Sequence, residues 1–302
     1  MMQSDIQRQY NMILQFWQSK DVHTAADLDL EMNGNGAKFI YHNGKIENEK
    51  ITYHDTREIY DHGGVTSYTG DVRTLFEIQN LCAGYQRFLT AFANNEPLDE
   101  ALVLELHSIL TQGTYDMHRY EIGERPGSYK KHDYVTGVDE VGALPEDVQE
   151  EMSELLAEIS DITDEQALTA AAYLHAKLEN IHPFADGNGR VGRLLMNYLL
   201  VTHHHPPIII FEEDRKAYYN ALETYDRSLD LEPLKQFLRM QTCKTWQQRM
   251  ERQQLSSHGA QKAETDLSRQ PMADRFAAAK AQAEQHNSGH STPDHPNHDP
   301  ER

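Results

Sequence analysis

The chain has 302 residues, of which 48 are acidic and 28 are basic, and its formal net charge at pH 7 is -20. Such an excess of acidic residues argues against a broad basic face for nucleic acid or anionic lipid, because both partners are themselves negatively charged. Two cysteines are too few for a disulfide framework and are typical of a reducing compartment. No apolar run approaches the roughly 20 residues of a membrane-spanning helix. We therefore expect a cytoplasmic protein without a nucleic-acid or membrane partner.

Three segments are expected along the chain. Residues 1–64 form an N-terminal helical segment, residues 65–250 form the core that carries the chemistry, and residues 251–302 form a flexible polar tail. The tail is expected from its composition, which is dominated by Gln, Ala, Ser, His, Asp and Asn.

A helical period of apolar residues runs through most of the core, so the expected fold class is all-α. In chain order, the predicted helices cover residues 71–93, 99–112, 145–161, 165–180, 188–203, 215–229 and 234–249. The clearest is 145–161, where Val148, Met152 and Leu155 repeat at steps of three and four residues. One short β-hairpin is expected at 128–137, where residues of high strand propensity lie between two glycines.

The candidate chemistry is concentrated in the loop between the fourth and fifth predicted helices. Gly187, Asn188 and Gly189 can adopt positive φ angles and expose backbone N–H groups at a helix start, which makes a binding site for an anion such as phosphate. Arg190 and Arg193 follow three residues apart on one helical face, so both guanidinium groups can reach that phosphate.

Two further residues of the same loop complete this candidate site. Asp186 offers a carboxylate beside the phosphates, a ligand suited to Mg²⁺. His182 is held by the following proline and can take a proton from an attacking hydroxyl as a general base. Taken singly, each feature has an ordinary explanation, since a Gly-Asn-Gly run is often only a turn and arginines can form salt bridges. Together they favour phosphoryl-group chemistry.

This loop resembles the signature of the Fic family, His-Pro-Phe-x-Asp/Glu-Gly-Asn-Gly-Arg-x-x-Arg, at every specified position. The resemblance extends over about residues 39–238. It implies the Fic fold, a helical core with a short β-hairpin flap, and the transfer of AMP from ATP to a Tyr, Ser or Thr hydroxyl. It also implies that Arg190 contacts the α- and β-phosphates and that Arg193 contacts the γ-phosphate.

The resemblance also covers a flap at residues 127–135, whose edge pairs with an extended segment of the target protein in this family. We therefore expect the target to dock near 128–137. Further nucleotide contacts are expected on the flap and on the helix at 215–229, namely Lys131, His132, Asp133, Tyr134, Tyr218, Tyr219 and Asp226. The alternatives are a plain surface hairpin and tyrosines that only pack one helix on another.

Upstream of the core, residues 43–48 resemble the family's inhibitory motif, Ser/Thr-x-x-x-Glu-Gly/Asn. The resemblance implies that Glu47 pairs bidentately with Arg193 and so removes the cation that should hold the γ-phosphate. Asn43 replaces the usual hydroxyl residue and Gly44 disfavours a helix, so we expect inhibition to be weaker than usual. The alternative explanation of Glu47 is an exposed helical acid.

These features together predict a protein adenylyltransferase that is inhibited by its own Glu47 and uses ATP as co-substrate with Mg²⁺. A hydrolase that removes AMP, or a transferase of another phosphate-containing group, keeps the same fold and remains an alternative. A non-catalytic nucleotide-binding module is the alternative from another class. The sequence is compatible with a homo-oligomer.

Overall fold

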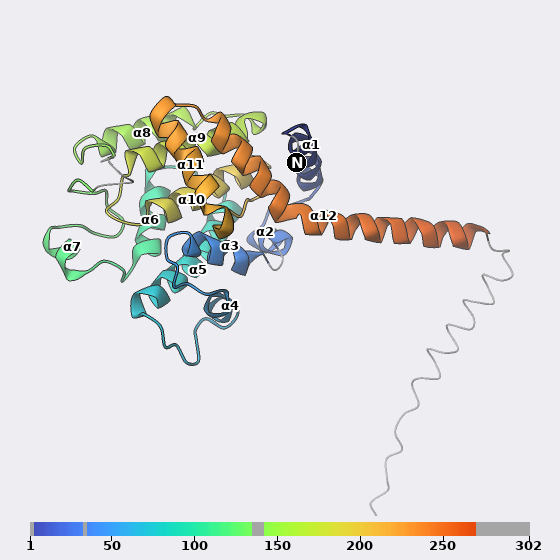
Figure 1. Ribbon diagram of the computed structural model, residues 1–302, viewed down its shortest axis with the longest axis horizontal. Helices are drawn as coiled ribbons and strands as arrows, with labels where there is room; N and C mark the ends of the chain where they lie inside the picture. Colours follow the sequence, from blue (N-terminus) through green and yellow to red (C-terminus); the bar gives the residue numbers. More distant parts are fainter. Residues whose placement is uncertain (1–2, 33–34, 135–141, 270–302) are drawn as a thin grey trace, which may run out of the picture. The chain divides into compact units, whose positions relative to one another are not determined.

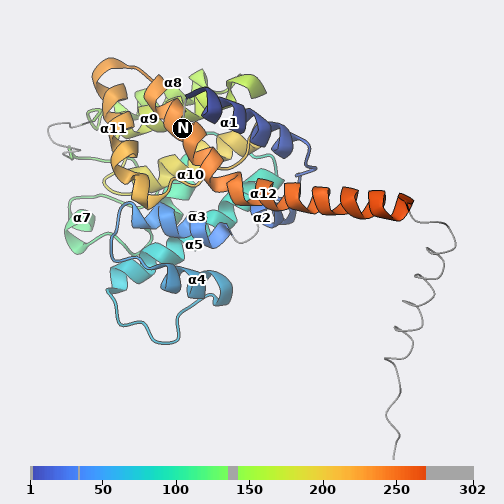
Figure 2. The ribbon, with the colours of Figure 1, turned by 45° about the vertical axis from the view of Figure 1, so that its right-hand side comes forward.

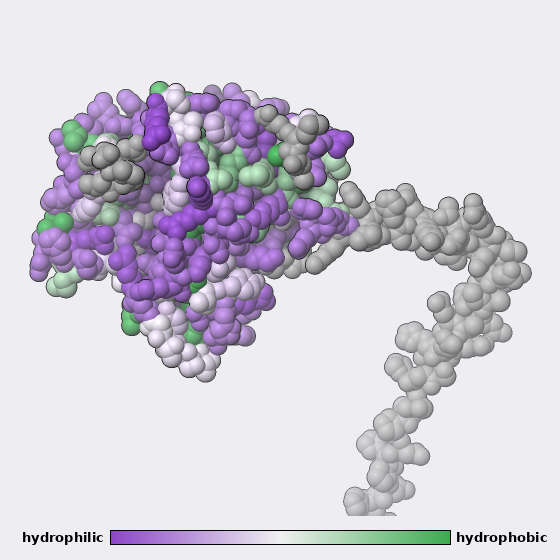
Figure 3. Space-filling model, in the orientation of Figure 1, coloured by the Kyte–Doolittle hydropathy of each residue, from purple (hydrophilic) through white to green (hydrophobic). Residues whose placement is uncertain are grey.

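The structure is a computed structural model that describes residues 3–32, 35–134 and 142–269. The chain divides into two compact units, Met1–Trp246 and Gln247–Arg302. No β-strand occurs in the described residues, so the predicted all-α class is confirmed (Figure 1). Hydrophilic residues predominate on the face of the first unit shown in Figure 3. Within the described ranges, no helix combines the length and the apolar character needed to cross a bilayer.

The N-terminal part of the first unit contains α1 (Gln3–Gln18), α2 (Ala25–Met32), α3 (Gly36–Lys45) and α4 (Tyr53–His62). The chain continues with α5 (Val72–Ala93), α6 (Glu100–Thr111), α7 (Met117–Glu121) and α8 (Val148–Glu158). The last part contains the short 3₁₀ turns η1 (Asp164–Gln166) and η2 (Glu212–Asp214), α9 (Ala167–Ile181), α10 (Asn188–Thr202), α11 (Arg215–Ser228) and the beginning of α12. Helix α12 (Glu232–Arg269) continues past Trp246 into the second unit. The seven predicted helices correspond to α5, α6 and α8–α12.

Their starts agree with the sequence to within three residues, and capping side chains fix the starts of α5 and α6. Asp71 accepts a hydrogen bond from the first turn of α5, and Asp99 does the same for α6. Asp116 caps α7, which is too short to show an apolar period and was not predicted. In contrast, α12 runs well past the predicted end at residue 249. The rest of the tail, from residue 270, lies outside the described residues.

Helix α10 lies at the centre of the first unit. It packs against α9 on one side and against α5, α6 and α3 on the other, and α8 and α11 cover α9 (Figures 1 and 2). Residues 190–201 of α10 are all buried. The loop that begins α10 is therefore held by neighbours on several sides, which makes it a rigid place for a site.

Helix α3 fits closely against α5 because of Gly44. A Cβ atom at this position would lie 2.6 Å from the terminal methyl group of Ile51 and 2.7 Å from that of Leu81. Phe39 and Ile46 are buried on the same segment. The glycine that we expected to weaken α3 instead allows its close approach to the core.

The β-hairpin expected at 128–137 is wrong for its described part, since none of residues 128–134 lies in a strand. The backbone N–H of Lys130 donates to the carbonyl of Pro183, and the N–H of Lys131 donates to the Glu124 carboxylate. These two donors are therefore not available for a ladder between strands. The remainder of the expected hairpin lies outside the described residues.

Candidate active site

A cavity of ≈ 1010 Å³ opens at the start of α10. Its walls come from the turn after α3, from α5 and α7, from α9 and the loop before α10, and from α11. It is lined by Glu47, Arg73, Arg119, Glu179, His182, Ala185, Asp186, Gly187, Asn188, Gly189, Arg190, Arg193, Tyr218, Tyr219, Leu222, Glu223, Asp226 and Arg227. Segments far apart in the sequence thus meet around the predicted phosphate site.

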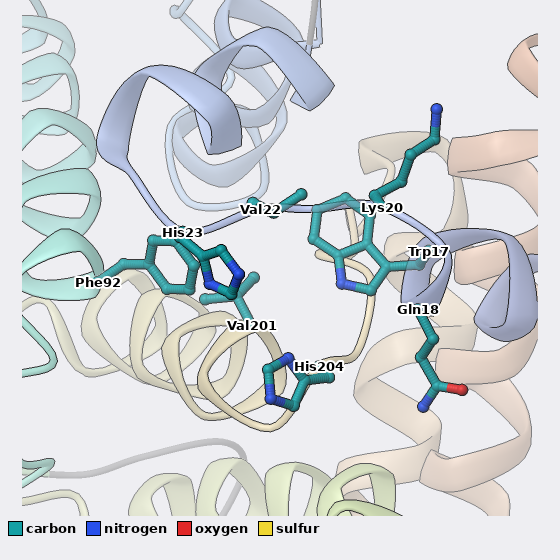
Figure 4. Close-up of a pocket in the computed structure, with 8 residues that line it drawn as sticks. All are labelled: Trp17, Gln18, Lys20, Val22, His23, Phe92, Val201 and His204. Carbon is teal, nitrogen blue, oxygen red and sulfur yellow. The ribbon is translucent and has the colours of Figure 1, made fainter.

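A second cavity lies between α1, α5 and the end of α10, where Trp17, Phe92 and His204 are among its lining residues (Figure 4). Its volume is ≈ 30 Å³, which accommodates water but no nucleotide. The cavity at α10 is therefore the candidate active site.

The predicted anion-binding turn has the backbone that this role requires. Gly187 has a φ of 87° and caps α10, whose N-terminus lines the cavity. A Cβ atom on Gly187 would lie 2.8 Å from the Thr111 side chain, and one on Gly189 would lie 2.3 Å from the Glu47 carboxylate. Gly187 therefore needs glycine because of its positive φ, and the missing Cβ of Gly189 leaves the space that the Glu47 carboxylate occupies. The backbone N–H groups of this turn can approach a phosphate closely.

The loop before α10 is anchored by His107 of α6. The His107 ring stacks on Phe184 with 3.7 Å between centroids, and its Nδ1 accepts a hydrogen bond from the Gly127 N–H. Its Nε2 then carries the proton and donates to the Asp186 carbonyl at 3.1 Å. Burial lowers the pKa of His107 to about 4, which keeps the ring neutral as this pattern requires.

His182 ends α9 in a left-handed conformation, with a φ of 51°. Its backbone N–H donates to the Leu178 carbonyl, and the Asn188 amide nitrogen lies 3.0 Å from its Nε2. Asn188 is itself fixed, because its side chain both donates to and accepts from the backbone of Phe184. Burial, and secondly the nearby Lys130 ammonium, lower the pKa of His182 to about 4. At neutral pH the imidazole is therefore unprotonated and can accept a proton.

Asp186 is surrounded by guanidinium groups. Arg190 donates to its Oδ1 at 2.9 Å, Arg73 donates to its Oδ2 at 2.7 Å, and Arg119 lies 3.7 Å from the same oxygen. Burial opposes ionisation, but these cations hold the pKa of the carboxyl below its usual value. Within the described part of the chain, no group of three or more His, Cys, Asp or Glu residues could hold a metal ion. Asp186 therefore fits Mg²⁺ only together with phosphate oxygens and after Arg73 has moved away.

Arg193 is buried and is held by the N-terminal segment. Its Nη2 donates to the Glu47 carboxylate at 2.8 Å and to the Asn43 carbonyl at 3.0 Å. Its Nε donates to Asn43 Oδ1 at 2.7 Å, and its Nη1 donates to the Tyr218 hydroxyl at 3.3 Å. The bidentate pairing expected for Glu47 is wrong, because Asn43 and Tyr218 take the other donors. We call the contacts of Glu47 and Asn43 with Arg193 the α3 lock.

A buried polar group lies behind Arg193 and was not predicted. The Tyr218 hydroxyl lies 2.5 Å from His175 Nε2. The His175 Nδ1 and Glu179 Oε1 atoms are both buried without a hydrogen-bond partner among the described residues. A Cβ atom on Gly192 would lie 2.5 Å from the first and 3.5 Å from the second, so glycine leaves the space that these atoms share.

Burial, and secondly the Glu47 carboxylate, raise the pKa of Glu179 from its ordinary value near 4.5 to about 8. The folded protein therefore retains a proton that the unfolded chain releases between these values, and its stability falls as the pH rises through this window. We expect Glu179→Gln to remove this loss of stability, because glutamine does not titrate. The variant's gain in unfolding free energy over the wild type should grow from pH 5 to pH 8, by up to about 1.4 kcal/mol per pH unit. Urea unfolding at both pH values checks this, and an equal difference at both would contradict it.

The cavity brings together most of the residues predicted from the sequence. Those that line it are Glu47, His182, Asp186, Gly187, Asn188, Gly189, Arg190, Arg193, Tyr218, Tyr219 and Asp226. Those that do not line it are Lys131, His132, Asp133 and Tyr134. The first three of these four are exposed, and the Tyr134 hydroxyl donates to the buried Glu124 carboxylate.

Sequence reasoning missed five charged residues of the cavity lining, namely Arg73, Arg119, Glu179, Glu223 and Arg227. Arg73 lies 113 positions before its partner Asp186, so no local spacing connects the two. Arg73 and Arg119 both follow capping aspartates, and this signal predicts the helix start but not the partner across the cavity. Glu179 lies on α9, and neither the apolar period of the predicted helix at 165–180 nor the family resemblance singles this residue out.

Comparison with known proteins identifies the family. Residues 97–200 match the model of the Fic/DOC family. A protein adenylyltransferase Fic from Nematostella vectensis is 30% identical over 214 residues, which are 68% of this chain and 47% of that protein. The protein adenylyltransferase fic-1 of Caenorhabditis elegans is 30% identical over 206 residues, which are 66% of this chain and 38% of that protein. The chain thus spans less than half the length of these curated relatives.

Solved structures show the same fold. Residues 134–508 of Fic-1 from C. elegans superpose with a TM-score of 0.69 at 22% identity, covering 84% of this chain and 73% of that one. A Fic-domain signaling protein from Bacteroides thetaiotaomicron gives a TM-score of 0.65 at 24% identity, covering 78% and 93%. The fold, the complete signature loop and the family match agree, and the chain belongs to the Fic/DOC family.

Proposed function

We propose that this chain is a protein adenylyltransferase that transfers AMP from ATP to a Tyr, Ser or Thr hydroxyl of a target protein or of the chain itself. The observation that carries the proposal is the meeting of an unprotonated His182 with the N-terminus of α10 and two buried arginines in one cavity. The curated relatives named protein adenylyltransferase support the same reaction.

The proposed reaction is an in-line displacement at the α-phosphorus. His182 takes the proton of the target hydroxyl, and the hydroxyl oxygen then forms a bond to the α-phosphorus. The bond from the α-phosphorus to the oxygen that bridges to the β-phosphate breaks, and pyrophosphate leaves. The backbone N–H groups of the 187–189 turn and the Arg190 guanidinium offset the charge that develops on the phosphates.

We propose Asp186 as the residue that holds Mg²⁺ in this reaction, together with phosphate oxygens. The bound ion would supply further neutralisation of phosphate charge. The Asp186 carboxylate lines the cavity directly before the 187–189 turn, and this position supports the assignment.

We also propose that the α3 lock inhibits the enzyme. Arg193 is the residue whose family role is to contact the γ-phosphate, and Glu47 and Asn43 occupy its donors. ATP that lacks this contact is not oriented for in-line attack. Relief of inhibition requires that the turn after α3 moves away from Arg193.

The target protein is proposed to dock along residues 128–134, next to the site. Lys130 links this segment to the loop of His182 through its hydrogen bond to Pro183, and the side chains of Lys131, His132 and Asp133 are exposed. A nucleotide contact by residues 131–134 stays a prediction, as do the homo-oligomer, the cytoplasmic location and the division of the chain at residue 64.

Incubation of the protein with Mg²⁺ and ATP labelled at either the α- or the γ-phosphate tests the reaction. We expect label from the α-phosphate to become covalently attached and label from the γ-phosphate to leave as pyrophosphate, with mass spectrometry locating AMP on a hydroxyl side chain. Attachment of the γ-label would indicate a phosphotransferase. ATP binding without any attachment, even after removal of Glu47, would indicate a non-catalytic module.

A further inference from the structure

Two arginines outside the signature loop extend into the cavity beside Asp186. Arg73 comes from the first turn of α5, and Arg119 comes from α7. Arg73 Nη2 lies 2.7 Å from Asp186 Oδ2, and Arg119 Nη1 lies 3.7 Å from the same oxygen. Since Arg190 already pairs with Oδ1, the carboxylate has more cationic partners than its own charge requires.

The other carboxylates near these arginines do not account for both of them. Arg73 Nε donates to Glu77 Oε1 at 3.0 Å, and the buried Glu77 side chain also accepts a hydrogen bond from Asn48. Arg119 lies 4.0 Å from Asp116, whose side chain is 62% exposed and which caps α7. An exposed ion pair at this distance contributes little. Arg73 Nη2 and the Arg119 head group, whose nearest carboxylate oxygen is the shared Asp186 Oδ2, can therefore exchange this partner for a ligand of higher charge.

The two arginines also have the freedom to change partners. Their side chains are 43% and 22% exposed, whereas that of Arg190 is 4% exposed and also donates to the Leu110 carbonyl. Arg193 is occupied by the α3 lock. In the locked protein, Arg73 and Arg119 are thus partly exposed cations on the cavity wall, next to the N-terminus of α10 that attracts phosphate.

We propose that Arg73 and Arg119 bind the terminal phosphates of a nucleoside triphosphate, and that Arg73 leaves Asp186 when it does so. The exchange replaces one charge-assisted hydrogen bond by another and frees Asp186 Oδ2, the oxygen that Mg²⁺ needs. This inference rests on the proposed function only in placing the triphosphate in this cavity. It assigns two phosphate-binding residues that the signature loop does not contain.

The proposal predicts opposite effects of one substitution on two ligands. Arg73→Gln removes a phosphate contact, so ATP affinity should fall about 10- to 100-fold, as expected for one charge-assisted hydrogen bond. The same change exposes Asp186, so Mn²⁺, used as a probe for Mg²⁺, should bind the nucleotide-free variant more tightly than the wild type. A purely structural role of Arg73 predicts weaker binding of both ligands.

Calorimetric titration with ATP and with AMP, and electron paramagnetic resonance of Mn²⁺ without nucleotide, test these effects. We expect Arg73→Gln and Arg119→Gln to lose ATP affinity but to bind AMP within about twofold of the wild type, which also shows that they fold. Arg73→Lys should retain part of the ATP affinity. The control is Arg57→Gln, which removes an ion pair with Asp61 on α4, since neither residue lines the cavity.

Unchanged ATP affinity in both glutamine variants, or equal losses for ATP and AMP, would overturn the proposal. Weaker Mn²⁺ binding in Arg73→Gln would overturn the exchange at Asp186. The outcome is separate from that of the labelling experiment, because the difference between ATP and AMP can persist in a protein that attaches no AMP to any target. A wild-type protein that binds no ATP would contradict both proposals.

Discussion

Replacement of Glu47 by glycine is expected to raise the rate of AMP transfer about 10- to 100-fold. Glu47 contributes one charge-assisted hydrogen bond to Arg193, at 2.8 Å, and such a bond is typically worth about 1.5–3 kcal/mol. Its loss releases Arg193 Nη2 toward the γ-phosphate. The change should appear mainly in the turnover rate, because the proposed inhibition leaves ATP bound to the locked protein in an unproductive orientation.

The rate of incorporation of α-labelled AMP into the protein itself measures this effect. Glu49→Gly is the matched control, since Glu49 lies two residues further on and its side chain is 85% exposed and pairs with the exposed Arg215. It should leave the rate unchanged. An equal rate in Glu47→Gly and in the wild type would remove the regulatory proposal and leave the catalytic one in place.

The α3 lock is not expected to open completely in this variant. Asn43 still accepts hydrogen bonds from Arg193 Nε and Nη2 through its side chain and its carbonyl. Asn43→Ala, added to Glu47→Gly, removes the side-chain bond and should raise the rate further. The position that departs from the usual inhibitory motif thus contributes to the α3 lock in this chain.

Replacement of His182 by alanine in the Glu47→Gly protein is expected to lower AMP transfer at least about 100-fold. General base catalysis typically contributes 10²–10⁴-fold, and the hydroxyl has no other positioned acceptor in the proposed reaction. ATP affinity should remain within a few fold, because His182 is assigned to the proton and not to the phosphates. A lower rate of AMP transfer with retained ATP affinity would indicate loss of the general base, whereas loss of both would indicate that the site no longer folds correctly.

The same labelling assay, with calorimetric titration of ATP, checks this expectation. His54→Ala is a suitable control, because His54 is an exposed histidine of α4 outside the cavity lining. Retention of more than a tenth of the activity in the His182→Ala protein would mean that another group removes the proton.

The sequence predicted the part of the site that is local in the chain. Residues 182–193 lie in one turn and the first turns of one helix, so their spacing alone determines which side chains face the cavity. The all-α fold was predictable for a similar reason, since apolar period and capping residues act over a few positions. Glu47 was found only because its motif resembles that of the family.

The rest of the site depends on how distant segments meet. Arg73 and Arg119 reach Asp186 only because α5 and α7 pack at the start of α10. Gly44 is unfavourable by helix propensity alone. The structure shows that its missing Cβ leaves room for the Ile51 and Leu81 side chains. The expected hairpin failed in its described part because contacts to the neighbouring loop and to Glu124 took its backbone donors.

A crystal structure of the Glu47→Gly protein with a non-hydrolysable ATP analogue is the most direct test of the proposed site. We predict that the triphosphate lies at the N-terminus of α10, with the γ-phosphate on Arg193 and the α-phosphate facing the His182 imidazole. A triphosphate bound elsewhere, or one in the cavity with His182 turned away from the α-phosphate, would contradict this account.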